Sequence, residues 1–319
     1  MKRTVALILF AAFLVSPLPA QTKRQKERPF VVALQWSAQA QFAGYYVAKE
    51  KGFYQAEGID VLLSHPFVTA STEERALADS VDAMVLPLVE ALEIVDKGMP
   101  LTNILQTSMN SGTMLISRYG NDPMQLGGRA KIATWRAGFS QIPYCVVKEK
   151  GLDYEGIPSA TIVNIFVAGA VDACLAMSYN EYYQILQAGL IRDPKAVYRF
   201  SEQGYNIQED GVYMTRRRWN KDRDRAERFA RASRKGWEWA VAHPQETLEI
   251  VMRYIADNRI ATNRTLQRLM LEETLRLQLD PDSGQRDFRL RPDMVRQASG
   301  MMHKAGLLER EIGYEELVP

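Results

Sequence analysis

Histidine, cysteine and long apolar runs are scarce in this chain of 319 residues, and each scarcity removes a class of function. The histidines are His65, His243 and His303, with no pair at i, i+4 spacing and no cysteine or carboxylate at ligand spacing. We therefore expect neither a zinc site nor a Ser-His-Asp triad. A phosphate-binding glycine loop and a dinucleotide glycine fingerprint are also missing. The sequence predicts no metal, no cofactor and no catalytic residues.

The N-terminus contains the longest apolar stretch, and it is too short to cross a bilayer. Lys2 and Arg3 precede a run from Val5 to Val15, far below the roughly 20 residues of a membrane span. Ala20 ends the segment, so residues 1–20 are typical of a cleaved secretory signal peptide. No cysteine follows for a lipid anchor. We expect a soluble mature protein in an envelope compartment, the periplasm of a Gram-negative cell.

The cysteine count limits the possible disulfides, and the charge balance limits the kinds of binding partner. Cys145 and Cys174 leave one disulfide or two buried thiols as alternatives. Without residues 1–20, the 40 basic and 38 acidic groups become 38 of each, so net charge gives no support for nucleic-acid binding. A basic run at 216–235 has arginines at three-residue spacing opposite an apolar stripe, which predicts a solvated helix face; docking onto a partner is the alternative. Those arginines are Arg225, Arg228, Arg231 and Arg234.

Strand and helix patterns alternate from Phe30 onward, after a flexible tether at 21–29. The predicted strands are 30–34, 59–63, 83–86, 101–106, 114–117, 131–134, 160–164, 174–177, 197–199 and 212–215. The predicted helices are 43–51, 72–78, 87–97, 140–150 and 181–188, and the chain after 215 is mostly helical. Such alternation with short connections predicts α/β architecture with parallel strands and helices on both faces of the sheet.

The series divides into two lobes. We place the crossings near 117–120 and 201–210, which gives lobe one as 30–117 plus 210–319 and lobe two as 118–209. Similar turns precede the strands at Ala83 and Cys174, and they bring the carboxyl ends of these strands to a crevice where ligands of open α/β sheets bind. A single doubly wound domain is the alternative, and it would need an unusually large number of strands.

Aromatic and amide residues gather in the loops that follow predicted strands. A flat heteroaromatic ligand needs ring faces to stack on and a few amide or carboxylate groups at its edge. Trp36 and Tyr45 are expected to stack on the ligand, and Trp36 is the stronger candidate. Glu181 is expected to bind an amine on the ligand, and Asp210 lies at the second crossing. The expected ligand-binding residues are Trp36, Gln39, Phe42, Tyr45, Trp135, Phe139, Tyr179, Asn180, Glu181 and Asp210.

Several segments together resemble one family. They are 34–61, 98–104, 176–182, 209–213, 231–237 with 243–244, 262–264 and 270–273, and they are similar to the substrate-binding proteins of ABC importers for thiamine-pyrimidine precursors, which are related to nitrate, taurine and sulfonate binders. The resemblance implies a two-lobed periplasmic binding protein fold of type II, with two hinge crossings and a helical C-terminal part. It also implies a monomer that clamps a small heteroaromatic ligand and delivers it to an ABC permease in the inner membrane.

The same superfamily includes a synthase branch that makes the thiamine pyrimidine from a lysine-bound pyridoxal phosphate and a histidine. At the positions of that lysine and histidine, this chain has Leu86 and Glu90, and the cysteine-rich motif of the branch is missing. Leucine cannot form a Schiff base. We therefore predict a binding protein and no enzyme, with the synthase, a binder of nitrate or an alkyl sulfonate, and a sensory module as alternatives.

Overall fold

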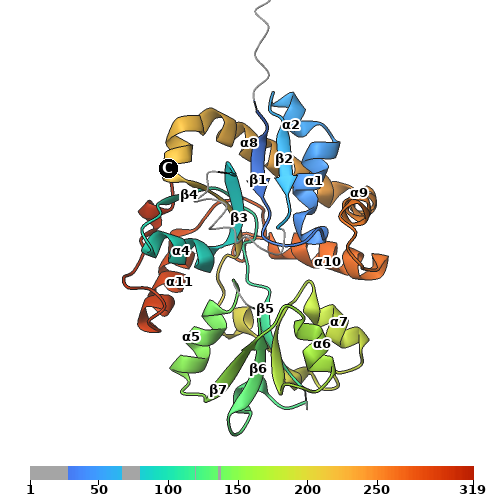
Figure 1. Cartoon of the computed structure of the whole chain (residues 1–319), viewed down its shortest axis with the longest axis vertical. Helices are drawn as coiled ribbons and strands as arrows, with labels where there is room; N and C mark the ends of the chain where they lie inside the picture. The colour runs from blue at the N-terminus through green and yellow to red at the C-terminus, as the bar shows by residue number, and fades with distance from the viewer. Residues whose placement is uncertain (1–27, 67–79, 119, 136–137) are drawn as a thin grey trace, which may run out of the picture.

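The structure is a computed structural model that describes residues 28–66, 80–118, 120–135 and 138–319. It forms two α/β lobes, one above the other in Figure 1. Within these residues each lobe has a five-stranded sheet, in the orders β2-β1-β3-β10-β4 and β7-β6-β8-β5-β9. The first sheet contains β1 (Phe30–Ala33), β2 (Val61–Ser64), β3 (Ala83–Pro87), β4 (Leu101–Gln106) and β10 (Asp210–Thr215). The second contains β5 (Thr113–Ser117), β6 (Ala130–Thr134), β7 (Tyr154–Pro158), β8 (Ala173–Met177) and β9 (Val197–Arg199).

Helices surround both sheets, and the C-terminal part is helical as predicted. Lobe one has α1 (Ala43–Glu50), α2 (Phe53–Ala56), α4 (Leu88–Asp96), α8 (Arg216–Ala242), α9 (Pro244–Asp257), α10 (Arg264–Leu277) and α11 (Pro292–Lys304). Lobe two has α5 (Gln141–Glu149), α6 (Ile162–Val167) and α7 (Glu181–Gln187). The predicted helix at 72–78 lies outside the described residues.

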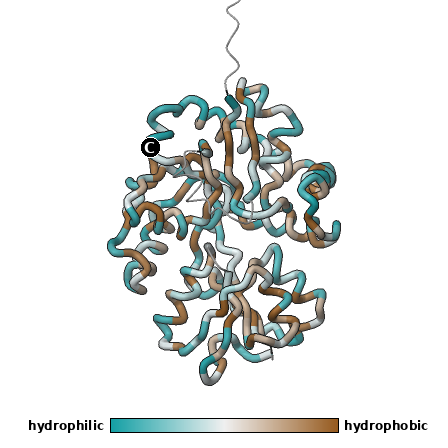
Figure 2. Tube along the Cα trace, viewed as in Figure 1, coloured by the Kyte–Doolittle hydropathy of each residue, from teal (hydrophilic) through white to brown (hydrophobic). Residues whose placement is uncertain are grey.

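The apolar residues of the strands form the core of each lobe, as the brown segments of Figure 2 show. Every residue of β3, β5 and β8 is buried. A strand that is buried on both faces consists of a continuous apolar run. The positions of these three strands were therefore easy to predict from the sequence.

The prediction of parallel sheets is wrong for two strands. β10 is antiparallel to β3 and β4, and β5 is antiparallel to β8 and β9. Each of them follows a crossing between the lobes. The other strands point their carboxyl ends toward the crevice, so a strand that enters a lobe from the crevice must run the opposite way.

The boundary between the lobes also differs from the prediction. β5 belongs to the second sheet, so the first crossing lies at 107–112, ahead of the expected 117–120. The second crossing, at 204–209, falls within the predicted 201–210.

The predicted strand at 160–164 is wrong as well. This segment begins α6, whose Ile162 and Phe166 are buried at i, i+4 spacing, and the strand β7 precedes it. β7 contains Gly156 and ends at Pro158, two residues that weaken a strand pattern, and it is tolerated because it forms the edge of its sheet.

Two further expectations concern side chains. Cys145 and Cys174 are free and buried, which decides between the alternatives. The prediction of a solvated arginine face on α8 holds for Arg231 and Arg234, which are exposed. Arg225 is only 9% exposed, and its guanidinium donates to Asp222 and to the Arg28 carbonyl. Much of this face therefore holds neighbouring segments of lobe one in place.

Candidate functional site

An aromatic slot lies between the two lobes where loops follow β1, β6 and β8. Lobe one contributes the β1–α1 loop, and lobe two contributes the loops after β6 and β8. The residues that line the slot are Trp36, Gln39, Gln41, Trp135, Phe139, Met177, Tyr179, Asn180 and Glu181. Seven of the ten predicted ligand-binding residues are therefore brought together in one place.

The slot is narrow and closed. Trp36 is 38% exposed at its mouth, whereas Trp135 and Tyr179 are 8% and 5% exposed inside it. The space that water can reach is only about 20 Å³. A ring-sized ligand can enter only if the lobes move apart, and hinge closure would then surround it.

The loop after β6 holds a strained backbone at the slot. Gly138 and Phe139 both have positive φ, 66° and 59°, and for a bulky residue such as phenylalanine this conformation is costly. The Phe139 ring meets Trp135 edge to face, with ring centroids 5.9 Å apart. Strain of this kind persists where the fold must aim a side chain, and here it places an aromatic ring in the slot wall.

The lobes also touch beside the slot. A Cβ added to Gly138 would lie 3.6 Å from Glu90 Oε2 and 3.7 Å from Pro87 Cγ, so this loop of lobe two rests on the β3–α4 junction of lobe one. On another side, Lys148 of α5 donates a hydrogen bond to the Ala305 carbonyl at the end of α11, over 2.8 Å. These contacts hold the two lobes in the closed arrangement.

Glu181 is the acidic group of the slot. It is 7% exposed, and its carboxylate accepts hydrogen bonds from the Met177 amide at 2.9 Å and the Asn180 side-chain amide at 3.1 Å. Burial raises the pKa of this carboxyl, while the bonds from Met177 and the side chain of Trp135 lower it. The carboxylate therefore fixes the turn between β8 and α7 as well as facing the slot.

A chain of amides links the slot to Asp210. The Gln39 Nε2 donates to Gln41 Oε1 at 2.6 Å, and Gln41 Nε2 donates to Asp210 Oδ2 at 2.6 Å. Gln35 donates to the other Asp210 oxygen at 2.7 Å. An ionised carboxylate only accepts, so it sets the direction of the whole chain. Burial raises the pKa of Asp210, and the hydrogen bonds from both glutamines lower it.

Phe42 and Tyr45 do not lie in the slot wall. Phe42 is 0% exposed and packs against the edge of His65. Tyr45 is 1% exposed, and its ring packs between Phe229 and Trp237. The stacking role expected for Tyr45 is therefore wrong, because the protein itself covers its ring. Phe42 lies in the short helix η1 (Ala40–Phe42) and Tyr45 in α1, and both face the apolar side that packs on the core.

The crossings are held together by Glu209, which the sequence analysis missed. Its carboxylate accepts from the hydroxyls of Ser111 and Thr113, both at 2.7 Å, and from the Gly112 amide at 3.1 Å. Burial raises the pKa of Glu209 to about 7, although these bonds lower it. The only sequence signal was its position beside Asp210 at the second crossing.

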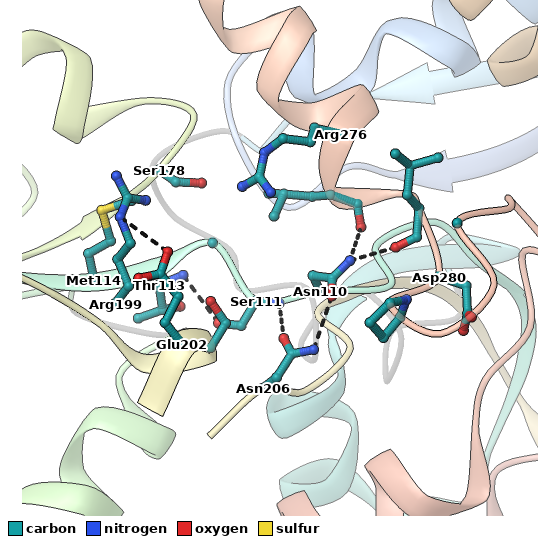
Figure 3. Close-up of a pocket in the computed structure, with 16 residues that line it drawn as sticks. Asn110, Ser111, Thr113, Met114, Ser178, Arg199, Glu202, Asn206, Arg276 and Asp280 are labelled. Atoms are coloured by element: carbon teal, nitrogen blue, oxygen red, sulfur yellow. Dashed lines mark hydrogen bonds and ion pairs between the residues drawn. The ribbon is translucent and has the colours of Figure 1, made fainter. Parts of the chain in front are cut away.

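A second pocket, of about 470 Å³, lies at the hinge (Figure 3). Asn206 of one crossing accepts from the Ser111 amide at 2.9 Å and donates to Asn110 of the other at 3.0 Å. Arg199 and Arg276 line this pocket from different lobes, but each is paired with an acid, Glu202 and Glu273 respectively. Their charge is thus balanced within the protein.

A family model described as NMT1/THI5 like matches residues 39–247. The chain belongs to this family. The NMT1/THI5-like match includes all of the slot except Trp36, and it ends before α10 and α11 begin.

Relatives of this NMT1/THI5-like chain include binders of heteroaromatic compounds. The formylaminopyrimidine-binding protein of Halalkalibacterium halodurans is 24% identical over 301 residues, 87% of this chain and 85% of that protein. The riboflavin-binding protein RibY of Chloroflexus aurantiacus is 22% identical over 286 residues, 81% of this chain and 75% of that protein.

Solved structures confirm the type II periplasmic binding protein fold of this family member. The aliphatic sulphonate-binding protein SsuA of Escherichia coli has a TM-score of 0.62 at 12% identity, over 92% of each chain. The CA3427 gene product of Candida albicans, which has the generic periplasmic binding protein fold, has a TM-score of 0.64 at 12% identity, over 90% of this chain and 92% of that one.

Two features are absent from residues 28–66, 80–118, 120–135 and 138–319. No helix there is long and apolar enough to cross a membrane. No group of histidine, cysteine, aspartate and glutamate side chains there is arranged to hold a metal ion.

Proposed function

We propose that this protein is the solute-binding component of an ABC importer and that its ligand is a small, flat, nitrogen-containing heteroaromatic molecule. The observation that carries the proposal is the slot itself, which has aromatic walls from both lobes. Two lobes that close on a ligand can present a different shape to a permease when loaded. Family membership and the fold support this role.

The chemistry of the slot favours a heterocycle. Trp36, Trp135 and Tyr179 offer ring faces and edges for an aromatic ligand, and Asn180 and Glu181 offer groups that match ring nitrogens and amines. The named binders of formylaminopyrimidine and riboflavin among its relatives point to the same ligand class.

A small anion such as nitrate or a sulfonate fits the site less well. Among the described residues that line the slot, none is lysine, arginine or histidine, and Glu181 contributes a negative charge. An anion would be repelled by that carboxylate. The arginines of the hinge pocket are each paired with an acid, so that pocket does not replace the missing positive charge.

The synthase alternative lacks its chemical groups at the aligned positions. Leu86 is 0% exposed in the middle of β3, and Glu90 lies in the first turn of α4. Neither side chain can bind pyridoxal phosphate covalently. Incubation with this cofactor should give no absorbance band at about 400 nm, where an internal Schiff base absorbs. Such a band would favour the synthase.

We propose further that the mature protein acts as a monomer in the periplasm and that its partner is an ABC permease of the inner membrane. The fold shared with periplasmic binding proteins supports this location. A sensory role, in which the closed protein signals to another membrane protein, would use the same slot.

Calorimetric titration tests the ligand class. The panel contains an aminopyrimidine, riboflavin, nitrate and an alkyl sulfonate, each added to the mature protein. We expect micromolar or tighter binding of a heterocycle, and we expect Trp36→Ala to weaken it by about 1–3 kcal/mol, the usual range for loss of a stacking residue.

Trp239→Ala is the matched control, because Trp239 of α8 stacks on His243 and under the Lys51 ammonium group, and it does not line the slot. It should leave the affinity unchanged. Binding of an anion alone would contradict the proposal.

A further inference from the structure

A small polar chamber adjoins the aromatic slot on the side of lobe one. Gln41 and Tyr179 line both spaces, so these two side chains form the wall between them. The chamber leaves about 20 Å³ for water, enough for one water molecule or for one or two non-hydrogen atoms of a ligand. Its other lining residues include Thr107, Asp210, Trp237, Thr274 and Gln278.

Gln278 is the distinctive group of this chamber. It follows the last turn of α10 and is 2% exposed, yet neither its amide oxygen nor its amide nitrogen has a hydrogen-bond partner among the described residues. Thr274, one helical turn earlier, is 9% exposed with an unpartnered hydroxyl. Buried amides of this kind are rare, because a buried polar group without a partner destabilises the protein.

Two other polar side chains of the chamber are hydrogen-bonded. Asp210 binds Gln35 and Gln41, and Thr107 donates to the Asp210 carbonyl at 2.9 Å. The unpartnered atoms that line the chamber are thus Trp237 Nε1 in α8 and the side-chain polar atoms of Thr274 and Gln278 at the end of α10. This helix lies beyond residue 247, where the match to the family model ends.

We infer that the chamber is a second subsite, in which Gln278 binds a small uncharged hydrogen-bonding substituent on the ring that occupies the slot. The inference rests on the proposed function. A primary amide offers a donor beside an acceptor, which matches an amine next to a ring nitrogen, or a single hydroxyl that both donates and accepts.

The size of the chamber limits the substituent. With room for only one or two non-hydrogen atoms, it accepts an amino, hydroxyl or hydroxymethyl group. A long polar chain such as the ribityl group of riboflavin is too large. The part of the ligand that enters the chamber is therefore one short polar substituent.

Two compounds of nearly equal shape test this inference. The probes are 4-amino-2-methylpyrimidine and 2,4-dimethylpyrimidine, which differ by an amine in place of a methyl group. Their affinities are measured by calorimetry for the unaltered protein, for Gln278→Met, and for Gln55→Met as the control, an exposed glutamine on α2. Methionine keeps the length of glutamine and removes its polar atoms.

We expect the unaltered protein and Gln55→Met to bind the amino compound about tenfold or more tightly than the dimethyl compound. In Gln278→Met the two affinities should lie within about threefold of each other, mainly because the amino compound binds less well. The ligand-free melting temperature of Gln278→Met should rise, since an unpartnered buried amide is removed.

Two results would overturn the inference and leave the proposed function intact: equal affinities for both compounds in the unaltered protein, or a preference for the amine that survives Gln278→Met. A fall in the ligand-free melting temperature would also overturn it, by showing that the amide already has a structural partner. If the unaltered protein bound neither these compounds nor any other heterocycle, the proposed function would fail with it.

Discussion

Helices α1 and α8 pack against each other in lobe one with almost no space between their backbones, whereas the surfaces of the two lobes face each other across polar side chains. A Cβ on Gly236 would lie 2.1 Å from the Gly44 carbonyl oxygen, and one on Gly44 would lie 2.1 Å from Trp237. In the cleft, by contrast, Gln278 and Thr274 are buried with polar atoms that have no partner. The α1–α8 contact therefore stabilises the fold, whereas the unpartnered groups of the cleft destabilise it and are available to bind a ligand.

The aromatic rings of the two regions differ in the same way. Phe229 is 0% exposed and stacks with Phe30 and Tyr54, at centroid distances of 5.2 and 5.5 Å. The Tyr54 hydroxyl meets Ser233 at 2.9 Å, so its polar atom is also satisfied. Trp36 at the slot is partly exposed and has no such ring partner within the described residues. Aromatic composition alone does not separate these roles; the partners of each ring do.

The largest expected effect comes from filling the α1–α8 contact. Gly236→Ala places a methyl group against backbone atoms that cannot move aside, so we expect the free energy of unfolding to fall by about 3 kcal/mol or more. Urea denaturation measures this. Gly300→Ala in α11 is the control, because its nearest neighbour would be 3.8 Å away and alanine should stabilise the helix by about 0.5–1 kcal/mol. Equal losses in both variants would contradict the account.

The next effect concerns pH and the cleft. The pKa of Glu209 is about 7 in the folded protein, against 4.5 for the free group. Between these values the folded state holds more protons than the unfolded state, so stability should decrease as pH rises from 4.5 to 7 and then level off. The full change is about 3 kcal/mol. Glu209→Gln should reduce this slope in denaturation curves measured at several pH values; an unchanged slope would show that Glu209 does not cause it.

Glu181→Gln distinguishes a ligand contact from a structural one. Its carboxylate supports the β8–α7 turn through the Met177 amide, and the glutamine oxygen can keep that bond. If the charge also binds the ligand, affinity should fall by about 1.5–3 kcal/mol with little change in the ligand-free melting temperature. Normal affinity together with reduced stability would mean that Glu181 only stabilises the turn between β8 and α7 and does not bind the ligand.

The smallest expected effect is at the hinge. A Cβ on Gly112 would lie 2.8 Å from Ser178 Oγ and 3.0 Å from Leu277 Cδ1, which come from different lobes. Gly112→Ala should therefore oppose closure and weaken ligand binding by about 1 kcal/mol, the lower end of overpacking effects, with a slight loss of stability. The comparison of affinity with melting temperature measures this. A loss of stability without any loss of affinity would argue against a role in closure.

The sequence was most informative where a loop carries aromatic and amide residues directly after a buried strand. Trp36, Trp135 and Tyr179 follow β1, β6 and β8, and parallel strands bring such loops to one edge. Phe42 and Tyr45 follow the same strand but lie on a helical face that packs inward, and a short helix start gives little sign of which face is buried. The loop in which a site residue lies was therefore easier to predict than the face of a helix on which it lies.

Other features depend on contacts between distant segments. Gln278 reaches the cleft only because α10 packs beside η1 (Ala40–Phe42), where Gln267 of that helix accepts from the Ala40 amide. Glu209 joins the crossings through residues 96–98 positions away. No local pattern marks such a residue, since its role exists only after both lobes have formed. The strands β5 and β10 were predicted, but their antiparallel direction was not, for the same reason.

A crystal structure of the protein with the heterocycle that it binds most tightly in calorimetry shows directly whether the slot is the binding site. We expect the ring to lie in the slot between the lobes, in contact with Trp36 of lobe one and with Trp135 or Tyr179 of lobe two, and near Glu181. A ligand found in the hinge pocket of Figure 3, or in contact with one lobe alone, would contradict it.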